Sequence, residues 1–132
     1  DMDMVEAAMQ NAGEKGLSDR IKIQQGDALA LDLPDESVDA VVSITVLHHV
    51  PGFEKAIAEA ARVLKKEGIL FIVDFDFKAS IFPRFEVLLG RPDSMFTWSE
   101  MGEALKKAGL KVLKVKSHSM GLFSCAAAKR NE

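Results

Sequence analysis

The chain has 132 residues, 48% of them hydrophobic, which is enough for a single domain over residues 1–132 with one core. Seventeen Lys and Arg against twenty Asp and Glu leave a net charge of −3 at pH 7, which argues against nucleic acid as a partner. The single cysteine, Cys125, excludes an internal disulfide, and no apolar stretch reaches the roughly 20 residues of a membrane span. These features predict a cytoplasmic protein with no membrane partner.

The first element is expected to be a helix. Apolar residues recur at helical spacing from Met4 to Ala12, Asp3 is in place to cap the helix, and Gly13 or Gly16 can end it. Because this pattern begins with the first residues, the chain is expected to be a piece of something longer.

Two strand signals follow. Residues 21–25 alternate apolar and polar side chains before a Gly-Asp turn, which is typical of a short strand. Residues 28–37 are expected to form a loop, since they contain a proline and several polar residues. Residues 38–46 are nearly all apolar and rich in β-branched side chains, which predicts a central strand buried on both faces of a parallel sheet.

The second half alternates helices and strands. The apolar spacing of residues 53–64 predicts a helix, and residues 69–75 predict another buried strand. Residues 76–96 are irregular and rich in aromatic side chains. A capping box at residues 97–100 begins a further helix, and residues 110–116 and 122–128 predict two strands that pair as a hairpin.

This order of elements predicts an α/β fold. Alternating strands and helices build a mainly parallel sheet with helices on both faces, and the C-terminal hairpin adds one antiparallel strand. In such sheets, ligands bind beyond the carboxyl ends of the strands.

Several short motifs are informative as an ordered set, although each is weak alone. They are Asp1-Met2-Asp3, Gly26-Asp27-Ala28, Leu33-Pro34-Asp35, Val38-Asp39-Ala40-Val41-Val42-Ser43, Val46-Leu47-His48-His49-Val50, Arg62-Val63-Leu64-Lys65-Lys66-Glu67-Gly68, and Phe96-Thr97 leading to Ala108-Gly109-Leu110. In this order the chain resembles the class I S-adenosylmethionine-dependent methyltransferases, particularly the branch acting on quinone precursors and other small molecules. The resemblance implies a Rossmann-like fold and S-adenosylmethionine as cofactor.

The resemblance also implies which acids bind the cofactor. Asp1, followed by Met2, matches the acid that holds the ribose hydroxyls; Asp3 competes with it but is better read as a helix cap. Asp27 matches the acid that accepts from the adenine amine, with the backbone of Ala28 facing the ring. The alternative for Asp27 is an Asx turn after a strand.

The segment after the central strand is expected to line the methionine end of the cofactor. Family members use backbone carbonyls and small side chains there, which correspond to Ser43, Ile44 and Thr45. Ordinary packing at a strand end is the alternative, and it is compatible with that role.

The candidate catalytic residues are His48, His49 and Asp76. An unperturbed imidazole titrates near neutrality, so one histidine is a candidate general base or substrate-orienting group. A structural histidine is the alternative, and adjacent side chains point in different directions unless the backbone turns sharply. A metal site is not expected, because two histidines without a third ligand nearby fall short of the usual ligand sets.

Two clusters in residues 75–98 have both a functional and a structural interpretation. The aromatic residues could roof an apolar acceptor pocket or could belong to the core; they are Phe75, Phe77, Phe82, Phe85, Phe96 and Trp98. Arg84 and Arg91 could meet an anionic acceptor or could lie in solvent.

The chain departs from the family pattern at its N-terminus. The family's first strand and its Gly-x-Gly turn are absent from this sequence, and the family's strand order 3-2-1-4-5-7-6 would leave a gap between residues 21–25 and 38–46. Three arrangements would fill the gap: a preceding segment of the parent protein, a second copy in a homodimer, or residues 21–25 pairing directly with residues 38–46 in a five-stranded sheet. The last two are favoured for this polypeptide.

The functional expectation is transfer of a methyl group from S-adenosylmethionine to an oxygen, nitrogen or carbon nucleophile on a small, partly apolar acceptor. The alternative is a catalytically inactive methyltransferase-like module that serves interaction or structure. A nicotinamide-dependent dehydrogenase has the same fold but fewer supporting signals.

Overall fold

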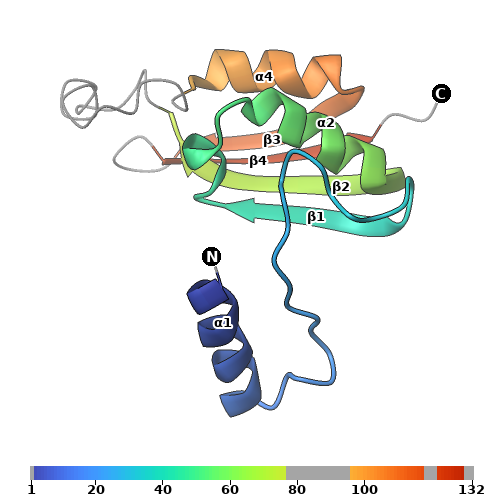
Figure 1. Ribbon diagram of the computed structural model, residues 1–132. Coiled ribbons are helices and arrows are strands. Elements are labelled where there is room, and N and C mark those ends of the chain that lie inside the picture. Colours follow the sequence, from blue (N-terminus) through green and yellow to red (C-terminus); the bar gives the residue numbers. More distant parts are fainter. Residues whose placement is uncertain (1, 77–95, 118–121, 130–132) are drawn as a thin grey trace.

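The computed structural model describes residues 2–76, 96–117 and 122–129. Its centre is a four-stranded sheet of order β1-β2-β4-β3, in which β1 is Val38–Ile44, β2 is Leu64–Phe75, β3 is Leu110–Ser117 and β4 is Leu122–Lys129 (Figure 1). β1 and β2 are parallel, while β4 is antiparallel to both β2 and β3. Three of these strands therefore share one direction, and the predicted α/β fold and C-terminal hairpin are confirmed.

Two helices cover one face of this sheet. α2 (Phe53–Val63) and α4 (Trp98–Lys107) lie side by side on it, while α1 (Met2–Glu14) stands apart from the sheet (Figure 1). The short 3-10 helix η1 (Leu47–His49) connects β1 to α2. The prediction of helices on both faces is therefore wrong for the described part of the chain, where the second face carries no helix.

Of the two predicted helix N-caps, Thr97 and Asp3, only Thr97 caps its helix. At the start of α4, the Thr97 side chain accepts from the Glu100 amide and the Glu100 carboxylate accepts from the Thr97 amide, which confirms the capping box. Gly109 follows the helix with φ +74°, in the left-handed region that glycine adopts without strain. Asp3 is not a cap, because it lies inside the first turn of α1, where its charge meets the positive end of the helix dipole.

The core lies between the two helices and the sheet. Leu70, Ile72 and Asp74 alternate toward the helices from β2, as Phe123, Cys125 and Ala127 do from β4. Burial raises the pKa of the Cys125 thiol to about 11, which keeps it protonated at neutral pH. No helix in the described residues is long and apolar enough to cross a membrane.

Two of the described aromatic residues of the predicted roof, Phe96 and Trp98, pack in or against this core, whereas Phe75 packs against His48. The Phe96 ring lies 4.5 Å from that of Phe53 between centroids, and the Trp98 ring lies 5.0 Å from that of Phe123. Of the other residues in the proposed roof and anion site, Phe77, Phe82, Phe85, Arg84 and Arg91 lie outside the described residues.

The strand predicted over residues 38–46 forms, but it is not buried on both faces. Val42 is 61% exposed and Ile44 is 58% exposed, because both point to the uncovered face of β1. β1 is also the edge of the sheet, so its outer backbone groups have no partner strand among the described residues. Burial on both faces would require a further strand beside β1 and a helix on its open face, and the described residues provide neither.

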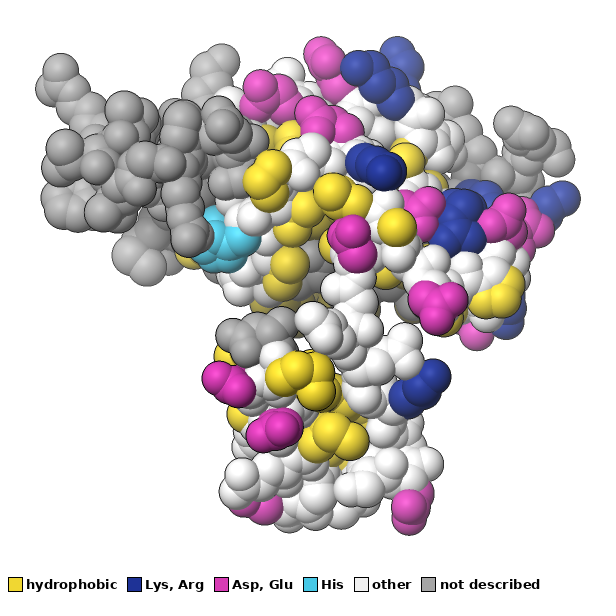
Figure 2. Space-filling view, in the orientation of Figure 1, with side chains coloured by type: hydrophobic (Ala, Val, Ile, Leu, Met, Phe, Trp, Pro, Cys, Tyr) yellow, Lys and Arg dark blue, Asp and Glu magenta, His cyan; other side chains and the backbone are white. Residues whose placement is uncertain are grey.

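Residues 21–25 form no strand, so that prediction and the five-stranded sheet are both wrong. An isolated strand gains no ladder hydrogen bonds, and its alternating pattern alone cannot hold it extended. The homodimer, in which a second copy would occupy the edge of β1, stays a prediction. Figure 2 shows apolar side chains gathered on the surface of α1, where Met2, Met4 and Met9 are all more than half exposed.

Within β2, position 68 has room only for a glycine. A Cβ placed on Gly68 would lie 2.8 Å from the Lys65 carbonyl oxygen, 2.9 Å from the Leu64 side chain and 3.2 Å from the Asp39 carbonyl oxygen. The chain of β2 folds closely against itself at Leu64 and Lys65, and β1 approaches at Asp39, so a side chain at position 68 would collide with both.

Candidate functional site

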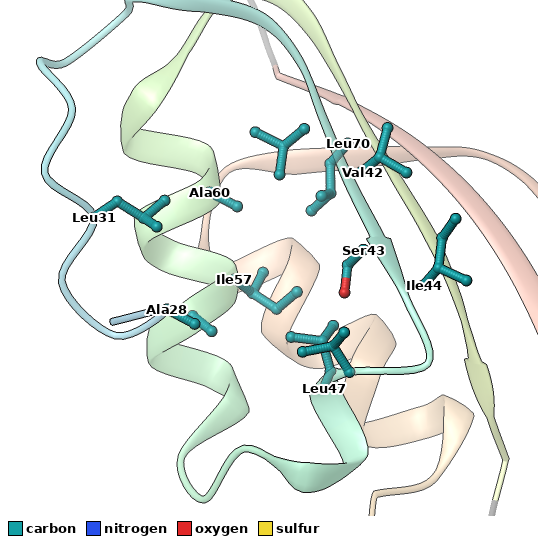
Figure 3. Close-up of a pocket in the computed structure, with 12 residues that line it drawn as sticks. Ala28, Leu31, Val42, Ser43, Ile44, Leu47, Ile57, Ala60 and Leu70 are labelled. Atoms are coloured by element: carbon teal, nitrogen blue, oxygen red, sulfur yellow. The ribbon is translucent and has the colours of Figure 1, made fainter. Parts of the chain in front are cut away.

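A pocket of about 220 Å³ opens between α2, β1 and the loop that precedes β1 (Figure 3). Its lining is mostly aliphatic and consists of Ala28, Leu31, Val41, Val42, Ser43, Ile44, Val46, Leu47, Ala56, Ile57, Ala60 and Leu70. Pockets that enclose a whole small molecule measure roughly 300 to 1,000 Å³. The described residues therefore form space for one ring system rather than for a complete cofactor.

The loop wall of the pocket follows a tight turn at Asp27. The Asp27 carboxylate accepts from the Leu29 amide at 2.9 Å, and the Asp27 carbonyl accepts from the Ala30 amide at 3.1 Å. This is the Asx turn that was the alternative interpretation of Gly-Asp-Ala, and it directs Ala28 into the pocket. The turn and a contact with a ligand are compatible, because Asp27 is exposed.

The end of β1 supplies the opposite wall. Figure 3 shows the Ser43 hydroxyl on the pocket side of the strand. Ile44 borders the pocket at the end of β1, although its side chain points toward the uncovered face. Thr45 follows with φ +50°, in the left-handed region that a β-branched residue rarely adopts, and its amide donates to the Val73 carbonyl at 2.7 Å. Of the predicted cofactor-binding residues, the pocket brings together Ala28, Ser43 and Ile44, with Asp27 and Thr45 next to them.

The residues predicted to bind the ribose, Asp1 and Met2, are not brought to this pocket. Met2 lies at the start of α1 and is 55% exposed, and Asp1 lies outside the described residues. α1 stands apart from the sheet (Figure 1), and Met2 is not among the residues that line the pocket.

A buried acid and a histidine meet where β1 and β2 end. The His48 Nδ1 atom lies 2.6 Å from Asp74 Oδ1, and the Leu47 amide donates to Asp74 Oδ2 at 2.9 Å. Asp74 is fully buried, whereas the His48 side chain is 11% exposed. Because a carboxylate accepts, Nδ1 of His48 carries the proton in this contact, and Nε2 is then the basic nitrogen of the neutral ring.

The two histidines do not diverge as adjacent residues in a strand would. The 3-10 turn brings their rings to a centroid distance of 3.9 Å, and the edge of Phe75 packs against His48 at 5.3 Å. His49 is exposed. The backbone thus makes the sharp turn that a shared site requires.

Asp76, the third catalytic candidate, contacts the start of α4. Its carboxylate accepts from the Trp98 amide at 3.3 Å, a contact that joins the end of β2 to the first turn of that helix. Among the described residues, no group of three or more His, Cys, Asp or Glu could hold a metal ion.

Asp74 was not among the candidate catalytic residues, although it stands at the carboxyl end of a predicted strand, where ligands bind in such sheets. The available signal was an acid inside an otherwise apolar strand, since a buried carboxylate is strongly unfavourable unless hydrogen bonds compensate it. Its partner is 26 positions away in the sequence, so the pairing depends on the parallel register of β1 and β2.

The sequence matches a known protein family. A family model described as a methyltransferase domain matches residues 1–72, more than half of the chain. The uncharacterized methyltransferase YcgJ of Bacillus subtilis is 42% identical over 72 residues, which are 54% of this chain and 28% of that protein. The ubiquinone/menaquinone biosynthesis C-methyltransferase UbiE of Bradyrhizobium is 38% identical over 73 residues, 55% of this chain and 29% of that protein.

The fold agrees with solved structures. A SAM-dependent methyltransferase from Aquifex aeolicus superposes with a TM-score of 0.76 at 23% identity, over 96% of this chain and 64% of that one. The chain thus spans less than two thirds of the length of these relatives, and the sheet order β1-β2-β4-β3 corresponds to the 4-5-7-6 part of the expected strand order. The chain belongs to the methyltransferase domain family, whose cofactor is S-adenosylmethionine.

Proposed function

We propose that this chain forms the adenine-facing and acceptor-facing part of an S-adenosylmethionine-dependent methyltransferase that acts on a small, partly apolar molecule. The observation that carries the proposal is the pocket at the end of β1. Ala28, Ser43 and Ile44 come from two separate motifs, and they line one aliphatic space at the edge where α/β sheets bind ligands.

The pocket has the chemistry that an adenine ring requires. Its aliphatic walls suit the faces of a planar base, and the exposed Asp27 carboxylate is placed beside it by the turn at residues 27–30. Backbone groups at Ala28 offer an edge for recognition. The residues present therefore fit the base, while Asp1 and Met2 remain proposed for the ribose and Ser43, Ile44 and Thr45 for the methionine end.

When bound, S-adenosylmethionine supplies an electrophilic methyl group, so the protein has to align the nucleophile and manage its proton. We assign the proton to His48. Asp74 holds Nδ1–H, which fixes the ring orientation and makes Nε2 the atom that accepts a proton from an oxygen, nitrogen or carbon nucleophile. His49 lies beside the ring as a second orienting group, and Asp76 acts through α4 rather than on substrate.

The acceptor class is inferred from the relatives. UbiE, a relative at 38% identity, is named for ubiquinone/menaquinone biosynthesis, which favours a small, partly apolar acceptor.

Calorimetric titration with S-adenosylmethionine tests the proposal. The wild-type chain is expected to bind, and Ala28→Phe is expected to abolish binding because the ring fills the pocket. Ala30→Phe is the matched control, since Ala30 lies in the same turn but is exposed and lines no wall of the pocket. Binding that survives Ala28→Phe, or no binding by the wild type at millimolar cofactor, would refute the assignment for this chain.

A further inference from the structure

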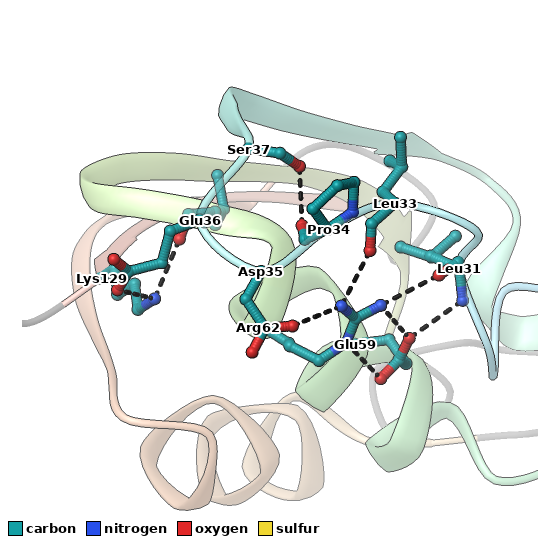
Figure 4. A network of polar contacts seen from close by, with 10 residues as sticks. Leu31, Leu33, Pro34, Asp35, Glu36, Ser37, Glu59, Arg62 and Lys129 are labelled. Carbon is teal, nitrogen blue, oxygen red and sulfur yellow. Dashed lines mark hydrogen bonds and ion pairs between the residues drawn. The ribbon is translucent and has the colours of Figure 1, made fainter.

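Two charged side chains of α2 hold the loop that forms one wall of the pocket (Figure 4). The Glu59 carboxylate accepts from the Leu31 amide at 2.9 Å, and Arg62 donates to the Leu31 carbonyl at 2.9 Å. Both polar groups of Leu31 are thus bound by neighbouring side chains of one helix turn. The Leu31 side chain itself lines the pocket.

The guanidinium of Arg62 uses all three of its nitrogens in this contact. Nε and Nη2 donate to the two Glu59 oxygens at 2.9 and 2.8 Å, and Nη1 donates to the Leu33 carbonyl at 2.8 Å and to Asp35 at 2.6 Å. A planar fork with fixed donor directions is required to reach these acceptors together, and a lysine ammonium cannot reproduce it.

Glu59 and Arg62 both keep their charges near neutral pH. The hydrogen bond from Arg62 and, to a smaller extent, the one from the Leu31 amide together lower the pKa of Glu59 to about 2. Glu59 and Asp35 in turn raise the pKa of Arg62. Both charges are therefore present wherever the protein is folded at ordinary pH.

The pair connects the two walls of the pocket. Ala56 and Ala60 line it from α2, three residues before Glu59 and one residue after it, while Ala28 and Leu31 line it from the loop. The far end of the same loop is bound separately, through backbone bonds from Glu36 and Ser37 to the end of α2. Glu59 and Arg62 are thus the side chains that fix the loop at the pocket itself.

We propose that Glu59 and Arg62 are positioning residues that set the separation of the loop wall from α2 and thereby determine the affinity for the adenine base. The identity of the base rests on the proposed function, whereas the fixing of Leu31 does not. The pair touches neither the base nor the reacting atoms. It acts through the placement of Ala28 and Leu31.

The test compares Arg62→Lys and Glu59→Gln with Lys129→Gln. Lys129 binds Glu36 at 3.0 Å and the Leu64 carbonyl at 2.9 Å, so its loss loosens the far end of the same loop without touching the pocket. Binding of adenosine and of S-adenosylmethionine is measured by calorimetry, and exchange of the Leu31 amide hydrogen by NMR.

Arg62→Lys is expected to weaken the binding of adenosine and of S-adenosylmethionine by the same factor, about tenfold. This factor corresponds to the lower end of the free-energy range for one charge-assisted hydrogen bond. Leu31 amide exchange should accelerate by a similar factor in both α2 variants and stay at the wild-type rate in Lys129→Gln. Equal affinity losses in all three variants would overturn the inference, because general loosening of the loop would then explain them. If the wild type binds no nucleoside, the proposed function fails, and an unchanged Leu31 exchange rate would still refute the positioning role independently.

Discussion

Replacing Asp74 with asparagine is expected to invert the tautomer of His48 while preserving the fold. In the wild type, Oδ1 of Asp74 faces Nδ1 of His48 and accepts from the Phe75 amide at 2.9 Å, while Oδ2 accepts from the Leu47 amide. An asparagine oxygen in the Oδ2 position keeps the Leu47 bond; its NH₂ group then faces Nδ1 of His48, which has to become an acceptor, and the Phe75 amide loses this acceptor. The ring proton moves to Nε2, and the nitrogen that would take the substrate proton is no longer basic.

The energetic cost follows from the contacts of the carboxylate. Hydrogen bonds to a charged acceptor contribute about 1.5 to 3 kcal/mol each and neutral ones about 0.5 to 1.5, and a donor left without an acceptor costs about 1 to 3 kcal/mol. Because the Phe75 amide loses its acceptor, Asp74→Asn should lower the free energy of unfolding by about 2 to 4 kcal/mol. Asp74→Ala would in addition leave the buried Leu47 amide without this acceptor, which adds about 1 to 3 kcal/mol. Methyl transfer assisted by a general base should fall by about 10² or more in Asp74→Asn.

The tautomer is read directly from the nitrogen chemical shifts of the His48 ring in long-range proton–nitrogen correlation spectra. His49 serves as an internal reference, and Asp76→Asn is the matched variant, since Asp76 contacts the start of α4 instead of the ring. A wild-type His48 that carries its proton on Nε2, or a tautomer unchanged by Asp74→Asn, would refute the reasoning.

Three further predictions concern stability. Gly68→Ala should lower the free energy of unfolding by about 2 to 3 kcal/mol in denaturant titration, since the new Cβ meets backbone at 2.8 Å; a loss under about 1 kcal/mol would contradict this close approach. Thr45→Asn should raise the free energy of unfolding by about 0.5 to 1 kcal/mol in thermal denaturation, because asparagine tolerates the left-handed φ of +50°, and no gain would mean that the backbone is unstrained. Glu59, whose pKa is lowered in the folded state to about 2, stabilises the fold above its ordinary pKa of 4.5 and progressively less as pH falls toward 2; Glu59→Gln should flatten the decline of stability across that window, and an unchanged slope would exclude the Glu59–Arg62 interaction.

The sequence predicted well those features that depend on nearby residues. Thr97 and Glu100 are three positions apart and form their capping box whatever the sheet does, so the start of α4 was predicted correctly. The strands β3 and β4 were also predicted within a residue at each end, because a hairpin brings its own partner.

Features that depend on distant partners were predicted poorly. Residues 21–25 have a strand pattern but no neighbouring strand, and Val42 was expected to be buried although its face of β1 is open. Asp74 stands at the end of a predicted strand, but its contact with His48 could not be predicted, because that contact arises only from the register of two strands. The pocket walls at Ala28 and Ser43 were foreseen from motifs, whereas the helix side chains that hold them were not.

The position of β4 bears on how the protein can be made. This strand follows β3 in the chain, yet it lies inside the sheet between β2 and β3, and its Cys125 and Ala127 side chains are buried. During synthesis, β2 and β3 therefore cannot be joined in one sheet until residues 122–129 have left the ribosome. Stop codons or proteolytic cuts before Leu122 would consequently remove the centre of the sheet rather than trim its border, and shortened products should be cleared by cellular proteases instead of accumulating as folded protein.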